Sequence, residues 1–395
     1  MLIKSTYYSF PYIFFLLLIF SNCLTKKLNN KNSLIINKQK EFFCLFYCLI
    51  FIGFRGFIFT DWTGYYKNFD SAPILLNSFS SIKQFINTNP FEKGYSLYVV
   101  ILKTFSFQNY IFFQLFDYVI NLILLWSFLR KYSNNTVFSY LFYFLFWGFM
   151  LDVNLQRNIK AVLIILNSIR FIERRKIVLY ICCIMLAMTF HITAIIYIVL
   201  FFLYPKKINR RFILSVAFFF NVLYLAKIDL LSELLILCSK TIVTGRFGIL
   251  LNRYVANKVG FISTGITIGY LERLATFLLV YFYYHKLIDK SKMNTFFCNV
   301  YFVYYFLSLF CSSNLILFER VVPLFIFPYW ILYPYLYKSL SLEKKKIFLL
   351  VFLMYSILKL LASYNTYLCY YDNQLFLPLS ATDRLGYYKR YGLPE

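Results

Sequence analysis

Two cations interrupt what is otherwise a nearly continuous apolar stretch of the sequence. Arg157 and Lys160 lie in NLQRNIKA (154–161), between the apolar runs LFYFLFWGFML (141–151) and AVLIILNSIRF (161–171). Ionised side chains are rare at apolar depth, and where they occur they usually serve a function. A guanidinium also presents planar donors that grip phosphate or carboxylate in a fork. The segment therefore raises the question of which anion these two cations bind.

Further charged or imidazole side chains stand at the edges of other apolar runs. They are Arg55, Asp61, His191, Glu272, Arg273 and Arg320. Arginines so placed can offset negative charge that develops on a leaving phosphate. His191, Asp61 or, behind them, Glu272 could take a proton from an attacking hydroxyl. The residue types thus predict a site that binds an anion such as a phosphate group.

The elements that position these side chains follow from composition. Of the 395 residues, 61% are hydrophobic and 14% are charged. A soluble domain cannot bury that much apolar surface. Many runs approach the roughly 20 apolar residues that a membrane-crossing helix needs. We therefore predict an all-α, polytopic transmembrane bundle of about twelve helices, with outer-face loops and short interfacial helices, in a bacterial inner (plasma) membrane.

The expected helices have boundaries accurate to a few residues. They lie at about 7–24, 42–60, 109–129, 136–151, 158–172, 177–190, 192–204, 212–228, 267–285, 295–312, 321–338 and 347–364. The pair at 177–204 is short for two crossings, so one long tilted helix is an alternative. The whole chain, 1–395, is predicted to be one integral membrane domain.

Charge sets the predicted orientation. Short Lys- and Arg-rich connections such as RFIERRK, PKKINRR and KLIDKSK favour the cytoplasmic face. With twelve helices all such connections fall on one side, and both termini lie outside. The long polar stretches, about 61–108, 229–266 and 365–395, then face outward. Within the first, GYSLYVVILKTF (94–105) is too short to span and predicts a helix lying in the interface.

In this topology five helices bring an Arg or His to one depth near the outer surface. The residues are Arg55, Arg157, His191, Arg273 and Arg320. A half-buried cluster of this kind would bind a diphosphate strongly. The candidate anion is therefore a lipid-linked diphosphate presented from the outer leaflet. Three alternatives stay open: Arg157 could snorkel to the interface, the Glu272–Arg273 pair could find neighbours on other helices, and His191 could be a core histidine.

Several function classes are disfavoured by the sequence. The net charge of +25 lies mostly in clusters that flank apolar runs, which indicates topology and anionic lipid partners rather than nucleic acid. No phosphate-binding Gly-rich loop and no H-E-x-x-H motif is present, and the nine cysteines form no paired C-x-x-C pattern. We predict no metal and no cofactor.

Four segments resemble motifs of the EpsG-like and Wzy-like polysaccharide polymerases. FIGFRGFIFTDWTGYYKNF (51–69) resembles an early gfR…D…Y signature, and FEKGYSLYVVILK (91–103) is similar to an E-x-G-Y segment. NLQRNIKAVLIILNSIRFIERRK (154–176) resembles an N-x-x-R-Q-x-x-A helix, and MLAMTFHITAIIYI (185–198) is similar to an F-H-x-[ST]-A segment. The match covers most of residues 50–330, including weaker similarity around GYLER and FERVVP.

The resemblance implies an activity and a partner. Members of that family act on undecaprenyl-diphosphate-linked oligosaccharide at the outer face of the inner membrane, where they extend O-antigen or exopolysaccharide without a nucleotide sugar or a metal. On this hypothesis Arg157, Arg273 and Arg320 hold diphosphate oxygens, with Arg55 in support. Tyr65, Tyr66 and Tyr95 could stack on sugar rings. Other expected partners are membrane lipids and a chain-length regulator protein.

Two rival functions fit the same features. An O-antigen ligase or a polyprenyl-sugar-dependent glycosyltransferase would share the outer pocket but attach a single glycan. A lipid-linked oligosaccharide flippase would also have about twelve helices and buried cations. A flippase, however, should carry charge through the full depth of a central cavity. Because the charges here gather at the outer mouth, the sequence favours an enzyme.

Overall fold

The computed structural model of the chain describes residues 4–24, 30–204, 206–241, 265–289, 291–376 and 378–390. Their regular secondary structure is helical, and the only β-pairing among these described residues is two isolated bridges, Lys4 with Thr366 and Arg55 with Asn373. The chain forms two compact units, residues 1–198 with 340–395 (unit 1) and residues 199–339 (unit 2). Each unit is described by itself.

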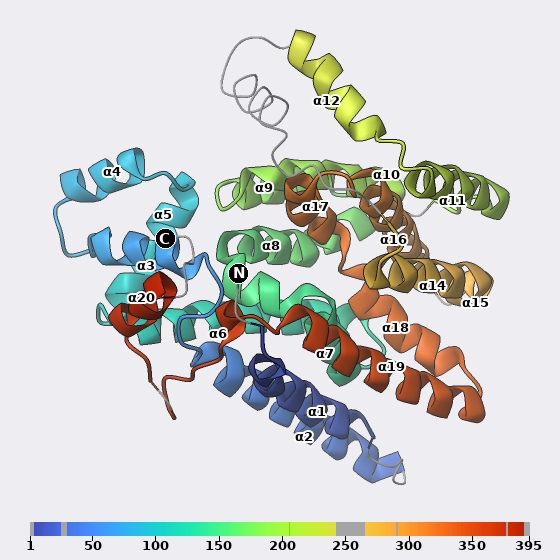
Figure 1. The fold of residues 1–395 in the computed structure, drawn as a ribbon, viewed down its shortest axis with the longest axis horizontal. Coiled ribbons are helices and arrows are strands. Elements are labelled where there is room, and N and C mark those ends of the chain that lie inside the picture. The colour runs from blue at the N-terminus through green and yellow to red at the C-terminus, as the bar shows by residue number, and fades with distance from the viewer. Residues whose placement is uncertain are drawn as a thin grey trace. The chain divides into compact units, whose positions relative to one another are not determined.

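Unit 1 contains both ends of the chain (Figure 1). Its α-helices are α1 (Phe10–Leu24), α2 (Asn30–Cys48), α3 (Trp62–Ser71), α4 (Phe79–Thr88), α5 (Lys93–Phe105), α6 (Tyr110–Tyr132), α7 (Thr136–Tyr143), α8 (Gln156–Glu173), α9 (Ile177–Met188), α19 (Leu342–Ser363) and α20 (Ala381–Arg390). The shorter turns are the 3₁₀ segments η1 (Thr6–Ser9), η5 (Ile192–Ile198) and η7 (Tyr367–Cys369), and the π segments η2 (Leu49–Gly53), η3 (Phe144–Gly148) and η4 (Met150–Asn154).

Unit 2 is built around one long buried helix, α16. Its elements are α10 (Val199–Leu203), α11 (Arg210–Leu225), α12 (Leu230–Thr241), α14 (Ile268–Phe282), α15 (Tyr284–Ile288), α16 (Lys292–Phe310), α17 (Leu315–Val321), the 3₁₀ turn η6 (Val322–Phe325) and α18 (Pro328–Ser339). Helices α11, α14 and α18 pack against α16, whose polar residues Asn294, Thr295 and Asn299 are buried.

Four described helices are long and apolar enough to cross a membrane. They are Thr6–Cys23, Tyr110–Tyr132, Lys292–Phe310 and Leu342–Ser363, and a fifth is added if the bent pair Arg210–Leu225 and Leu230–Leu237 counts as one span. The protein is therefore a multi-pass helical membrane protein. Twelve crossings, the loop orientations and a single membrane domain stay predictions. The predicted outer loop at 229–266 falls largely outside the described residues.

Other predicted helices are shorter or broken, each for a local reason. The stretch at 177–204 ends its α-helix at Met188 and continues past His191 as 3₁₀ turns. The stretch at 321–338 is interrupted before Pro328, which starts α18. The predicted helix at 136–151 changes to π-helix after Tyr143, and Trp147 takes a left-handed φ of 74°. Apolar periodicity does not reveal such breaks.

Arg55 lies outside the helix in which the sequence placed it. Helix α2 becomes π-helical and ends at Gly53, so the predicted helix over 42–60 stops before the arginine. The following residues instead pair with the C-terminal segment, where Gly56 N donates to Asp372 O at 2.9 Å and Gln374 N donates to Phe54 O at 2.8 Å. A Cβ on residue 56 would stand 1.5 Å from Asp372 Oδ2, which explains the glycine.

The C-terminal segment is fixed to unit 1 by buried polar and aromatic contacts. Arg384 of α20 is 0% exposed, donates through Nη2 to Tyr370 O at 2.9 Å and lies 5.1 Å from the centre of the Tyr367 ring. The hydroxyl of Tyr388 accepts a hydrogen bond from Trp62 Nε1 at 3.0 Å. Helix α20 therefore completes the packing around the first turn of α3.

Candidate functional site

The Glu92 carboxylate contacts two of the predicted site residues, Arg157 and His191. Glu92 Oε1 lies 3.1 Å from His191 Nδ1 and accepts from Ile192 N at 3.4 Å, while Glu92 Oε2 pairs with Arg157 Nη1. The side chains of Glu92, Arg157 and His191 are 20%, 24% and 13% exposed. They lie just before α5, at the start of α8 and just after α9 (Figure 1). We call these three residues the Glu92 triad.

A close backbone approach brings these elements together. Tyr95 N donates to Thr189 O at 3.1 Å, so the first turn of α5 rests on the turn that precedes His191. Gly94 permits this contact, because a Cβ there would lie 2.2 Å from Thr189 Oγ1 and 2.8 Å from Thr189 O. In the E-x-G-Y segment, Gly94 therefore allows the close backbone contact that places Glu92 beside His191.

Replacing Gly94 with Ala should therefore destabilise unit 1. The added methyl group must displace backbone as well as side chain, an overpacking cost of about 1–3 kcal/mol. We expect a lower melting temperature of the detergent-purified protein. The matched control is Gly64→Ala in α3, where the nearest atom to the new Cβ is 3.9 Å away. That variant should melt at or above the wild-type temperature, because Ala favours helix over Gly; equal losses in both would contradict the steric argument.

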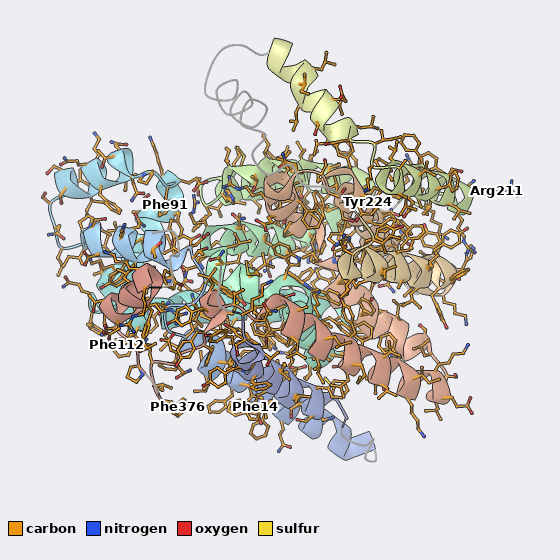
Figure 2. All side chains as sticks on the ribbon, viewed as in Figure 1. Phe14, Phe91, Phe112, Arg211, Tyr224 and Phe376 are labelled. Carbon is orange, nitrogen blue, oxygen red and sulfur yellow. The ribbon has the colours of Figure 1, made fainter. Side chains whose placement is uncertain are left out.

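Arg157 is held from several sides. Its guanidinium carbon lies 4.4 Å from the centre of the ring of Phe91, which Figure 2 labels. Tyr65 of α3 is close enough to act on it electrostatically. Its Nε is buried and has no hydrogen-bond partner among the described residues. Arg157 is thus oriented by protein groups on several sides.

The protonation of the Glu92 triad follows from its charges. Burial raises the pKa of the Glu92 carboxyl, but the hydrogen bond with His191 and the charge of Arg157 lower it by more, to about 2. Glu92 is therefore ionised at ordinary pH, and His191 Nδ1 must be the donor in their bond. In a neutral imidazole this leaves Nε2 as a free base, and Nε2 has no hydrogen-bond partner among the described residues.

Acidification should weaken the protein through Glu92. Its folded-state pKa of about 2 lies below the ordinary 4.5, so the ionised carboxylate stabilises the fold above pH 4.5, and this contribution is lost as the pH falls from 4.5 towards 2. Allowing for solvent screening, we expect about 1 kcal/mol, or a melting temperature lower by about 2–4 °C. Glu92→Gln should remove this part of the pH dependence; an unchanged profile would show that other groups cause it.

A second, deeper group of polar residues lies one helical turn below Arg157. Lys160 Nζ is 2.7 Å from Asp117 Oδ1 and donates to Asn121 Oδ1 at 3.0 Å. The hydroxyl of Tyr98 donates to the same Asp117 oxygen at 2.9 Å. The Lys160 and Asp117 side chains are only 3% and 2% exposed. Removing one partner would leave an uncompensated buried charge, so this pair fixes α8 against α6 and α5.

The deep group continues toward Arg55. Asn121 Nδ2 lies 3.4 Å from Asp152 Oδ1, and the Tyr143 hydroxyl donates to Asp152 Oδ2 at 2.7 Å. Arg55 is 1% exposed, donates through Nη1 to Ile52 O at 2.9 Å and acts electrostatically on both Asp152 and Lys160. Its Nη2 has no hydrogen-bond partner among the described residues. Arg55 therefore belongs to this interior group rather than to an open surface.

Basic and acidic side chains of unit 1 are interspersed in the site. Three cations and three carboxylic acids alternate, namely Arg157, Lys160 and Arg55 with Glu92, Asp117 and Asp152. The sequence suggested that Arg157 and Lys160 await an external anion, whereas the fold gives each an internal carboxylate. Lys160 is closed off by this pairing, and Arg157 remains partly exposed. Of the two, only Arg157 is available to a ligand in this structure.

The other predicted residues of unit 1 surround the Glu92 triad in different ways. Asp61 is exposed at the start of α3, and its backbone N–H donates to Asn154 Oδ1 at 3.0 Å, three residues before Arg157. Tyr65 and Tyr95 are buried, 6% and 1% exposed, and pack on each other. Tyr66 packs edge-on against Tyr110. Tyr65 and Tyr95 therefore belong to the core, whereas Tyr66 is half-buried.

Unit 2 brings its own predicted residues together. The Arg273 guanidinium of α14 lies 5.4 Å from the centre of the Phe318 ring on α17, so the GYLER and FER segments meet. Glu272 Oε1 accepts from Thr276 Oγ1 at 3.1 Å, and the Tyr301 hydroxyl donates to Arg273 O at 3.0 Å. Arg320 is exposed on α17. The predicted diphosphate ligands are thus divided between the two units.

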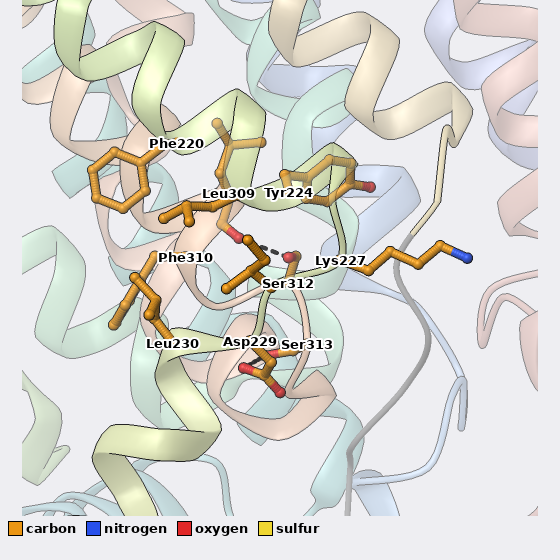
Figure 3. A pocket seen from close by; sticks show the side chains of 11 residues that line it. Phe220, Tyr224, Lys227, Asp229, Leu230, Leu309, Phe310, Ser312 and Ser313 are labelled. Carbon is orange, nitrogen blue, oxygen red and sulfur yellow. Dashed lines mark hydrogen bonds between the residues drawn. The ribbon is translucent and has the colours of Figure 1, made fainter.

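A small cavity in unit 2 is not a substrate site. It has a volume of about 30 Å³ and lies beside the bend between α11 and α12 (Figure 3). Asp229 accepts there from Ser313 at 2.7 Å, and Figure 3 shows Lys227 extending away from the carboxylate. The cavity has room for only about one or two water molecules. In the described part of the chain, no group of three His, Cys, Asp or Glu could hold a metal ion.

Sequence reasoning overlooked Glu92 as a site residue. It was one of several acids in a predicted outer loop, and its partners Arg157 and His191 are 65 and 99 residues away in the chain. The signal that could have found it is Gly94, because a glycine at the start of an apolar helix suggests a close approach by another segment. The glutamate two residues earlier is then placed at the contact.

Fold and site together define a class of protein. It is a multi-pass helical membrane protein in which three helix ends bring together a carboxylate-oriented histidine and an arginine. A family model described as the EpsG family matches residues 40–380, and the chain belongs to this family of membrane proteins, which is associated with exopolysaccharide synthesis. No curated protein and no solved structure matches the chain.

Proposed function

We propose that this protein is a polysaccharide polymerase that transfers a growing glycan from undecaprenyl diphosphate onto a lipid-linked repeat unit at the outer face of the bacterial inner membrane. Membership of the EpsG family supports the substrate class. The observation that carries the chemistry is the Glu92 triad, in which one carboxylate orients a histidine base and an arginine at the same place.

The proposed reaction has a simple balance. A hydroxyl oxygen of the acceptor sugar forms a bond to the anomeric carbon of the donor glycan, and the bond from that carbon to the diphosphate oxygen breaks. The electron pair leaves with the diphosphate, which gains one negative charge. His191 Nε2 takes the hydroxyl proton, while Glu92 holds the opposite ring nitrogen and stabilises the cation that forms.

Arg157 is the group placed to meet the developing negative charge. Its guanidinium is partly exposed and adjacent to the base, and preorganised charge of this kind is often the largest catalytic contribution. Protonation of His191 adds one positive charge beside Arg157. Proton transfer and charge stabilisation are therefore coupled: the site gains its positive charge as the leaving group gains its negative charge.

The other candidates keep weaker roles in this proposal. Asp61 is exposed and Glu272 is held by Thr276, whereas a carboxylate orients His191, so His191 is preferred as the base. Arg273 and Arg320 of unit 2 are proposed diphosphate ligands, and Arg55 supports the site electrostatically from the interior. No metal or cofactor enters the proposed chemistry. A chain-length regulator is a proposed protein partner.

One observation bears on the flippase alternative. The buried Lys160–Asp117 pair places charge within the candidate span α6. A flippase needs such charges to line an open path, yet both partners here are almost fully enclosed. This closure favours the enzyme, in which the pair positions α8.

Gene deletion distinguishes the proposals. Surface glycolipid from a deletion strain is separated by electrophoresis, before and after complementation. Loss of a polymerase leaves glycolipid capped with a single repeat unit, whereas loss of a ligase leaves polymer on its lipid carrier. Loss of a flippase leaves repeat units facing the cytoplasm. A ladder of normal length in the deletion strain would overturn the proposed function.

A further inference from the structure

Tyr98 of α5 contacts each of the segments that carry the Glu92 triad. Its ring packs edge-on against the ring of Phe190, the residue before His191, with the ring centres 5.7 Å apart. Lys160, one turn after the arginine of the triad on α8, has its Nζ 5.4 Å from the centre of the Tyr98 ring. Tyr98 itself lies on the helix that begins directly after Glu92. One half-buried side chain therefore links all three segments.

The hydroxyl of Tyr98 fixes the position of this ring. It donates to Asp117 Oδ1 at 2.9 Å, and the same oxygen lies 2.7 Å from Lys160 Nζ. The Asp117 side chain is almost fully enclosed on α6. Hydrogen bonds to charged groups are stronger than those between neutral groups, and burial strengthens them further. The ring of Tyr98 is therefore held firmly against α6 and α8.

A second contact joins α5 to the turn that precedes the histidine of the triad. Tyr95 N donates to Thr189 O at 3.1 Å, and the Tyr98 ring contacts Phe190 about one helical turn further along α5. Two contacts one turn apart fix the rotation of a helix about its axis as well as its distance from a neighbour. Because Glu92 directly precedes α5, this rotation sets the direction of the Glu92 carboxylate.

The direction of the carboxylate determines which nitrogen of His191 carries the proton. While Nδ1 donates to Glu92, Nε2 is left without a proton and can act as a base. If α5 rotates, this hydrogen bond lengthens and the proton can occupy either nitrogen. An imidazole protonated on Nε2 cannot accept a proton there, so the wrong tautomer is inactive as a base.

We propose that Tyr98 is a positioning residue that sets the tautomer of His191, because it holds Glu92 and the histidine turn against the buried Lys160–Asp117 pair. Tyr98 does not touch the reacting atoms in this role and acts through the carboxylate. The importance of the tautomer for catalysis rests on the proposed function. The tautomer itself is a property of the protein and can be measured without substrate.

The test is solid-state ¹⁵N NMR of the full-length protein in phosphatidylglycerol nanodiscs, with ¹⁵N-labelled histidine. The chain has two histidines, and His285→Ala assigns their signals. At about pH 8, where an ordinary imidazole is neutral, we expect wild-type His191 to carry its proton mainly on Nδ1. Tyr98→Phe removes only the hydroxyl and should lower the ratio of Nδ1–H to Nε2–H about tenfold, the usual effect of losing one hydrogen bond.

The matched control is Tyr12→Phe on α1. The Tyr12 hydroxyl donates to Cys369 O in the C-terminal segment, also at 2.9 Å and from a buried position in unit 1. This variant should lose a similar amount of thermal stability and keep the wild-type His191 signal. An unchanged tautomer ratio in Tyr98→Phe would overturn the proposal. An equal change in Tyr12→Phe would also overturn it, since loosening of the unit would then be the cause.

A parallel activity measurement separates this inference from the proposed function. Membranes of the deletion strain supply lipid-linked repeat units, and chain extension is followed for wild type and Tyr98→Phe. We expect kcat to fall by the same factor as the Nδ1–H population, with little change in KM. A tautomer shift in a protein whose wild type extends no chains would leave the positioning role standing and remove the polymerase. Extension by the wild type with no tautomer shift in the variant would do the reverse.

Discussion

Arg157→Ala is expected to abolish long polymer and to leave surface glycolipid with a single repeat unit. The guanidinium is the one cation of the unit 1 site that is both partly exposed and next to the proposed base. Removing a preorganised group that stabilises a developing anion typically lowers kcat by about 10²–10³. Chain extension is measured in membranes of the deletion strain, which supply lipid-linked repeat units as substrate.

The variants around Arg157 separate charge from geometry. Arg157→Lys keeps the charge but loses the planar fork and the full contact with Phe91, so it should recover only a small part of the activity. Arg170→Ala, at an exposed position on the same helix, serves as the control and should extend chains normally. Normal chain lengths in Arg157→Ala would remove this arginine from the mechanism.

His191→Ala is expected to lower kcat by about 10²–10⁴, the usual contribution of a positioned general base. It should also remove the acidic limb of the pH–rate profile, which a purely structural role would not do. Glu92→Gln keeps a hydrogen-bond acceptor but loses the negative charge that stabilises the protonated imidazole. It should therefore give an intermediate loss in kcat with little change in KM.

The chain offers a matched control for this experiment. It has one other histidine, His285, which is exposed in α15. His285→Ala should retain wild-type activity and the wild-type pH–rate profile. If His191→Ala retained the acidic limb, the base would have to be sought elsewhere, with Asp61 as the next candidate. Melting temperatures of both variants exclude loss of folding as the cause.

The parts of the fold predicted from sequence are those set by long apolar runs. Helices α1, α6, α16 and α19 coincide with predicted crossings because their length and hydropathy suffice. Segment 94–105 was correctly predicted to form a short helix, α5. The π-helical stretches of η2, η3 and η4 could not be predicted, because they depend on packing rather than on residue type. They determine where Arg55 and Asp152 lie.

For the site, residue chemistry identified the candidates but not their partners. Arg157 and His191 were singled out because charge and imidazole are unusual beside apolar runs. Glu92 joins them only through the contact of Gly94 with Thr189, which links segments far apart in the sequence. Tyr95 was expected to bind sugar, yet its helix turns the ring into the core. Which face of a short helix is buried depends on neighbours that the sequence does not reveal.

The attachment of the C-terminal segment to residues 54–62 has a consequence for biosynthesis. Residues 370–388 supply the hydrogen bonds that hold Gly56 and Trp62, so these early residues lack their final partners while most of the chain is being made. The contacts that fix residues 54–62 can form only after the last helix has been synthesised. Protein whose synthesis stops before α20 should therefore be degraded rather than accumulate.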